Sequence, residues 1–312
     1  MAGLAPALLS TQEAEQAISA YLTREMQRSV VSSVVDHPAN LVIFGEVHSA
    51  SVFKAYYLSE LVRAVRQRKP VITHFHASER WPNTPQTRQI ITSLMQAQPN
   101  QFINLITQIP QALDLVPFVA LLAQGINFPG RRFGMIPIDV GSSGAALDDI
   151  ARHEDVRHQQ LFESFRNSAT QCPDVPFNSI NSNNSRGHML LGAKHAARTH
   201  TRGRGDITTC ARLIGDGWTV HSVRLTMVPD PDNLESLKVV LRRGASDQTK
   251  IDLLPLLQRV AGGRPFYVDI TKSDSPFSEL RDGDQGAADI PFNKLYDAIL
   301  HISAHTVPFP TQ

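Results

Sequence analysis

Acidic and imidazole side chains recur at the places where buried strands are expected to end. Four apolar runs are each followed by such side chains, in the segments Gly45–His48 (GEVH), His76–Glu79 (HASE), Asp139 and Gly192–His195 (GAKH). In open α/β sheets, ligands bind beyond the carboxyl ends of the strands. We therefore expect a single cleft at that edge of the sheet, lined by Glu46, His48, Glu79 and His195.

Two kinds of chemistry suit this set of side chains. A carboxylate can orient an imidazole and stabilise its protonated form while the imidazole deprotonates a water molecule. Alternatively, the two glutamates and two histidines together can hold a divalent metal ion, which lowers the pKa of a bound water. The sequence leaves both open, and both lead to hydrolysis of an ester, lactone or amide bond.

Each of these residues also has a purely structural interpretation. A single glutamate is usually a surface carboxylate or a helix-cap partner, and a single histidine is usually hydrogen-bonded within the fold. Asp139 can equally cap a loop. The shared position after successive strands favours a functional role for the set. Gly45 and Gly192 agree with that position, since glycine permits a sharp exit from a strand.

The elements that must position these residues alternate along the chain. Strands are expected at residues 41–44, 71–75, 132–138, 188–191, 218–227, 265–270 and 298–302. Helices are expected at residues 11–35, 51–68, most of 85–125, 144–168, 206–215 and 251–260. This alternation predicts an α/β fold with a mainly parallel sheet flanked by helices on both faces. We expect one domain over residues 1–312, in which the Asn- and Ser-rich segment 170–187 is an irregular surface loop or a lid.

A second group of histidines looks like a zinc-binding helix but has the wrong spacing. His153, Glu154 and His158 lie on the helix expected at residues 144–168. The HExxH motif needs histidines four residues apart on one helix face. His153 and His158 are five residues apart, which is about 140° around a helix. We therefore expect this helix to carry exposed charges rather than a metal.

The charge of the chain bears on which molecules it can bind. The formal net charge is +1, so general electrostatic binding to nucleic acid has little support, and a small molecule or a peptide is the expected substrate. No apolar run reaches the length of a membrane span. The short apolar stretch near the N-terminus has no basic residue before it, unlike a secretory signal, which favours a cytoplasmic location.

Cys172 and Cys210 form no CxxC unit, so two unpaired thiols are favoured over a disulfide. The oligomeric state stays open.

The paired motifs GEVH and GAKH, with Glu79 between them, resemble a superfamily that groups erythromycin esterases, haem-binding ChaN-like lipoproteins and Wnt-cleaving TIKI proteases. The similarity extends through ITTCARLIGDGWTVHSVRL and RPFYVDI and spans about residues 38–310. The resemblance implies an active site that contains Glu46, His48, Glu79 and His195, with Asp139 matching less closely. Ser49 stands where esterase-like members usually have glycine, so GEVHS is nearer to the ChaN and TIKI members.

The resemblance implies a hydrolase of the erythromycin-esterase or TIKI kind, assisted or not by a divalent metal. The alternatives are a ChaN-like module that binds haem or a metal without catalysis, and a toxin or effector domain of the same fold. For a haem-binding member, Tyr56 or Tyr57 on the helix after GEVH is the candidate iron ligand, although haem is less favoured than a divalent metal.

Overall fold

The computed structural model describes residues 10–28, 30–35, 37–46, 73–96, 101, 104, 133–139, 154–171, 185–199, 207–227, 237–242, 248–282 and 290–302. The expected helix at residues 51–68 lies outside this part of the chain, as do Tyr56, Tyr57, Cys172 and most of the segment 170–187.

A seven-stranded sheet forms the centre of the fold, with strand order β3-β2-β4-β1-β5-β10-β8. Its strands are β1 (Leu41–Glu46), β2 (Thr73–Pro82), β3 (Phe133–Asp139), β4 (Ser185–Gly192), β5 (Val220–Met227), β8 (Phe266–Asp269) and β10 (Ala298–Ile302). All neighbours pair in parallel except β8, which runs antiparallel to β10 at one edge. The prediction of an α/β fold with a mainly parallel sheet is confirmed.

Strand β1 shows that both faces of this sheet are covered. It lies in the middle of the sheet, and all six of its residues are buried. A parallel strand buried on both sides reads as a continuous apolar run, and the run Leu41–Phe44 is what revealed this strand in the sequence.

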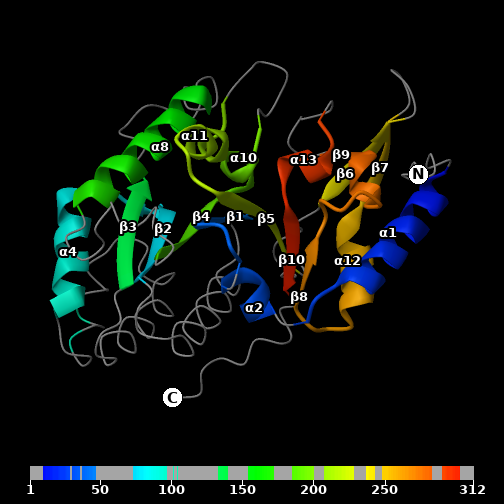
Figure 1. Cartoon of the computed structure of the whole chain (residues 1–312), viewed down its shortest axis with the longest axis horizontal. Helices are drawn as coiled ribbons and strands as arrows, with labels where there is room; N and C mark the ends of the chain where they lie inside the picture. Colours follow the sequence, from blue (N-terminus) through cyan, green and yellow to red (C-terminus); the bar gives the residue numbers. More distant parts are fainter. Residues whose placement is uncertain are drawn as a thin grey trace.

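Three helices cover one face of the sheet, over β3, β2, β4, β1 and β5. They are α8 (Glu154–Gln171), the short α10 (Ala193–Ala196) and α11 (Thr209–Gly215), which lie next to one another in Figure 1. Leu161 and Phe165 of α8 and Leu213 of α11 pack in one apolar cluster with strand residues such as Ile43 and Leu191. Helix α4 (Pro85–Gln96) follows β2 and contacts β3.

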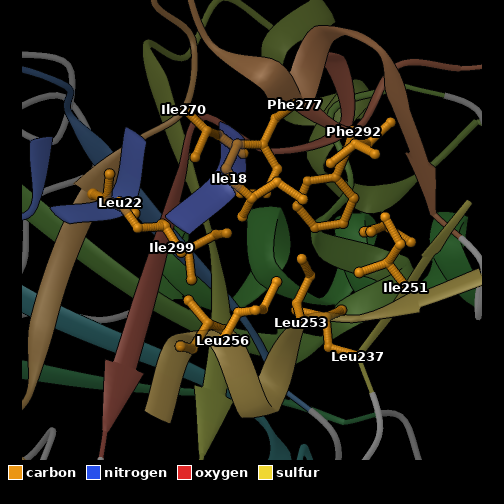
Figure 2. Packing of buried hydrophobic residues seen from close by; sticks show 14 of the residues in the cluster. Ile18, Leu22, Leu237, Ile251, Leu253, Leu256, Ile270, Phe277, Phe292 and Ile299 are labelled. Carbon is orange, nitrogen blue, oxygen red and sulfur yellow. The ribbon is translucent and has the colours of Figure 1, made fainter. Parts of the chain in front are cut away.

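A second apolar cluster lies toward β10 and β8. It joins helices α1 (Thr11–Glu25), α12 (Leu253–Ala261), η3 (Pro276–Ser278) and α13 (Phe292–Leu295) to a small antiparallel sheet of β7 (Gln248–Asp252), β6 (Lys238–Arg242) and β9 (Leu280–Asp282). Figure 2 shows Ile18 and Leu22 of α1 packed toward Ile299 and Phe277. None of these three short strands was expected from the sequence.

The N-terminal helix expected at residues 11–35 is two helices. Helix α1 ends at Glu25 and α2 spans Val30–Val35. Between them the backbone of Gln27 pairs with Tyr267 in both directions, with N···O distances of 2.7 and 3.0 Å. A backbone that bonds to β8 cannot also continue the hydrogen bonds of a helix, so the helix breaks there. In the described part of the chain, no helix is both long and apolar enough to span a membrane.

Candidate active site

Glu79 lies inside a strand rather than after it. We expected HASE to follow a strand that ended at Phe75, but β2 continues to Pro82. Because side chains alternate along a strand, Glu79 leaves β2 on the same face as Phe75 and Ala77, which pack in the apolar cluster with α8 and α11. The Glu79 carboxylate therefore lies on the sheet face covered by α8 and α11, and the residue is only 5% exposed.

The Glu79 carboxylate is held by the end of the neighbouring strand. Its Oε1 accepts a hydrogen bond of 2.7 Å from the backbone N–H of Gly192, the last residue of β4. A buried charged group needs such donors to offset the loss of water. Gly192 has φ −57° and ψ 145°, which any residue can adopt. Strand β4 does end at Gly192 and α10 begins at the next residue, but this exit does not require a glycine, and the Gly192 N–H is what the site uses.

His195 comes from α10, which begins directly after Gly192. The His195 side chain is 15% exposed, and its Nε2 lies 3.9 Å from Oε2 of Glu79. The helix rests on β1 at Gly45, where a Cβ atom would lie 2.9 Å from Cβ of Ala196 and 3.1 Å from Cα of Ala193. Gly45 thus allows α10 to approach the sheet closely. The chain after Glu46 lies outside the described residues, so the strand exit expected of Gly45 stays a prediction.

Two hydroxyl groups fix α10 from other elements. Ser222 of β5 donates a hydrogen bond to the carbonyl of Ala196 at 2.6 Å. Tyr296, just after α13, donates one to the carbonyl of Ala193 at 3.1 Å. A four-residue helix leaves most of its carbonyls without partners inside the helix, so these donors stabilise it and hold His195 in place.

His158 completes the cluster, and the sequence interpretation missed it. It lies on α8, is fully buried, and its Nδ1 is 2.9 Å from Nδ1 of His195. The two rings are in edge contact, with centroids 4.6 Å apart and planes at 78°. Rejecting the HExxH interpretation led us to expect an exposed helix face here. The available signal was the i, i+3, i+7 spacing of His158, Leu161 and Phe165, which marks a buried face.

The backbone of Glu46 lies next to that of Gly192, but the Glu46 side chain leaves the sheet on the face opposite to Glu79. It is the last residue of β1, is 3% exposed, and pairs with Gly192 in the ladder. Gly45 faces α10, so alternation sends the Glu46 side chain out on the opposite face. The structure thus brings the side chains of Glu79 and His195 together. Of Glu46, only the backbone is adjacent, through its pairing with Gly192. His48 lies outside the described residues.

Asp139 has a structural contact. It ends β3, as expected, and its Oδ1 lies 2.6 Å from Nη2 of Arg157 on α8, with both side chains partly exposed. Arg157 directly precedes His158, so this ion pair ties the part of α8 that carries His158 to the end of β3.

The described side chains do not by themselves form a metal site. Among the residues that the structure describes, no group of three or more His, Cys, Asp or Glu side chains is arranged to hold a metal ion. Glu79 already accepts a hydrogen bond on one oxygen. Cys210 is a free, fully buried thiol, and burial raises its pKa well above the ordinary value, which disfavours the reactive thiolate.

Comparison with known proteins identifies the fold. No protein-family model matches the chain, and a search of curated proteins finds no match. Among solved structures, a succinoglycan biosynthesis protein is 11% identical with a TM-score of 0.55, covering 94% of this chain and 98% of that one. A Bacillus cereus protein is 10% identical with a TM-score of 0.52, covering 93% and 97%. The haem-bound ChaN of Campylobacter jejuni is 10% identical with a TM-score of 0.38, covering 65% and 89%. The chain shares its α/β fold with the first two proteins over nearly its whole length.

Proposed function

We propose that this protein is a hydrolase of an ester, lactone or amide bond, with Glu79 and His195 at the centre of its active site and Glu46 and His48 completing it. The observation that carries the proposal is the buried Glu79 carboxylate facing the imidazole of His195, with 3.9 Å between Oε2 and Nε2. A buried carboxylate costs folding free energy unless it is paired or hydrogen-bonded. A carboxylate and an imidazole together form a general base.

We propose that one water molecule contacts both side chains during the reaction. A direct hydrogen bond needs about 3 Å between nitrogen and oxygen, so 3.9 Å is too long for one. One water at roughly 2.8 Å from each atom can donate one hydrogen to Nε2 and the other to Oε2. Such a water is oriented by two acceptors, and its oxygen lone pairs face outward toward a substrate carbonyl.

The reaction then needs one proton transfer in each direction. His195 takes a proton from the water on Nε2 as the water oxygen bonds to the substrate carbonyl carbon. Glu79 stabilises the imidazolium cation through its negative charge. The same proton passes to the leaving oxygen or nitrogen when the carbon–oxygen or carbon–nitrogen bond breaks, which returns His195 to its neutral form. Glu46 and His48 come from the adjacent strand end. His48 is proposed to bind the substrate or the developing oxyanion, and Glu46 is proposed to orient His48.

The test is a panel of chromogenic esters, lactones and peptide amides with wild-type protein and two variants. His195→Gln and Glu79→Gln should each lower kcat by about 10²- to 10⁴-fold, the usual contribution of a general base. Glu163→Gln is the matched control, because Glu163 is an exposed carboxylate on α8 and its loss should leave kcat unchanged. Folded His195→Gln and Glu79→Gln proteins with wild-type rates would overturn the proposal. Stoichiometric haemin binding without hydrolysis of any substrate would favour a binding module instead.

A further inference from the structure

We propose that His158 is a positioning residue that fixes the tautomer of His195, so that Nε2 of His195 is the unprotonated nitrogen that faces Glu79. The catalytic consequence of this inference rests on the proposed function, whereas the tautomer itself does not. The inference comes from the hydrogen bonds around one atom, Nδ1 of His158.

A backbone donor determines the state of that atom. Thr209 is the first residue of α11, and the first N–H groups of a helix have no acceptor within the helix. The Thr208 hydroxyl caps the helix by accepting from Ala211 N, at 3.0 Å. The N–H of Thr209 donates instead to Nδ1 of His158, at 3.2 Å. A backbone amide can only donate, so Nδ1 of His158 is an acceptor and carries no proton.

The state of His158 then sets the state of His195. The two Nδ1 atoms lie 2.9 Å apart, which is a hydrogen-bond distance, so one of them must donate. The single lone pair of His158 Nδ1 is shared between the Thr209 N–H and the closer His195, with the Thr209 hydroxyl oxygen also 3.4 Å away, so Nδ1 of His195 carries the proton. A neutral imidazole has a proton on only one nitrogen. When the His195 ring is neutral, its Nε2 therefore keeps its lone pair, and this is the atom 3.9 Å from Oε2 of Glu79.

His158 is held rigidly enough to perform this role. Its side chain is fully buried, and the Thr209 hydroxyl donates to its backbone carbonyl at 3.2 Å. The preceding residue, Arg157, is tied to β3 through Asp139. The ring can therefore act as a fixed acceptor, as a carboxylate or carbonyl does for histidines in many active sites and metal sites.

The first experiment measures the tautomer directly in the wild-type protein. Ring nitrogens of ¹⁵N-histidine-labelled protein are observed by NMR, and the His195 signals are assigned by their loss in His195→Gln. We expect Nδ1 of His195 to appear protonated and Nε2 unprotonated at a pH where the ring is neutral. A His195 ring with the proton on Nε2, or one that averages both tautomers, would overturn the inference even if the protein proves to be a hydrolase.

Two variants of His158 then test the consequence. In His158→Asn the amide oxygen takes the place of Nδ1 and can accept both hydrogen bonds, whereas in His158→Gln the amide reaches the place of Nε2. We expect His158→Asn to retain the tautomer and kcat within about threefold, and His158→Gln to lose the single tautomer. The loss in kcat for His158→Gln should be about 10- to 100-fold at unchanged KM, as for other residues that orient a functional histidine.

The outcomes separate the two proposals. If no substrate is hydrolysed, the NMR measurement still decides the role of His158. If Glu79 and His195 prove essential but both His158 variants keep a single tautomer and wild-type kcat, the hydrolase proposal stands and the positioning role is wrong.

Discussion

The two oxygens of Glu79 have different tasks, and substitutions can separate them. Oε1 accepts from the N–H of Gly192, and Oε2 faces His195. Glu79→Gln can keep the amide oxygen on Gly192, so its free energy of unfolding should stay within about 1 kcal/mol of wild type. Glu79→Ala removes the acceptor of a buried N–H and should cost about 1–3 kcal/mol. Urea unfolding followed by circular dichroism measures both. Equal stability of the two variants would show that the contact with Gly192 contributes nothing.

Sequence position was enough to pair some of these residues but not others. Glu79 and His195 were both assigned to the carboxyl edge of the sheet, and the structure places them 3.9 Å apart. The same reasoning could not assign a face of the sheet to Glu46, because the face depends on strand register. His158 was missed because its partners, His195 and Thr209, come from elements that meet it only in the folded protein.

The short helix α10 depends on the absence of a side chain at Gly45. In Gly45→Ala, the new Cβ would lie 2.9 Å from Cβ of Ala196 and 3.1 Å from Cα of Ala193, so α10 must move away from β1. We expect a loss of about 1–3 kcal/mol in the free energy of unfolding. We also expect reduced hydrolysis, because His195 moves with the helix.

Gly215→Ala is the control for this prediction. Gly215 ends α11, and a Cβ there meets nothing within 4 Å. Since alanine also favours a helix more than glycine does, Gly215→Ala should be neutral or slightly stabilising. Thermal denaturation of both variants makes the comparison. A Gly45→Ala protein as stable as Gly215→Ala would show that α10 adapts without cost.

A helix or strand could be predicted where the residues that stabilise it are its own neighbours in sequence, and not where they come from distant parts of the chain. Strands β1 and β10 are largely apolar runs, and β10 was expected at residues 298–302 and is found there. The short strands β6 and β9 are stabilised by antiparallel partners and by the cluster around α12. Their burial is decided by contacts distant in sequence. The break after α1 has the same origin, since Gln27 pairs with Tyr267, 240 residues away in the chain.

At the scale of the whole molecule, His195 lies where the two apolar clusters meet. Ala196 packs in the cluster of β1, α8 and α11, whereas the next residue, Ala197, packs in the cluster of α1, α12 and α13. The Tyr296 hydroxyl reaches α10 from the second cluster, and His158 reaches it from the first. A shift of one cluster against the other therefore changes the distance between His195 and its partners. The distances in the candidate site thus depend on how the two clusters pack together.

Two buried histidines distant from the candidate site make the stability of the whole molecule depend on pH. Burial lowers the pKa of His221 from an ordinary 6.5 to about 4, and nearby His37 lowers it further while Asp297 opposes the shift. Burial likewise lowers the pKa of His301 to about 4. Both rings are thus neutral in the folded protein at pH values where an unfolded chain binds protons.

We therefore expect the free energy of unfolding to fall as the pH is lowered from about 6.5 to about 4, by up to roughly 3 kcal/mol for each of these histidines. Well above pH 6.5 both states are neutral at these positions, and their contribution is constant. Urea midpoints measured between pH 4 and pH 8 should show this slope in wild type and a shallower one in His221→Gln and in His301→Gln. Arg259→Gln, which removes an exposed cation that does not titrate in this range, should keep the wild-type slope. Wild-type slopes in both histidine variants would mean that neither ring resists protonation in the folded protein.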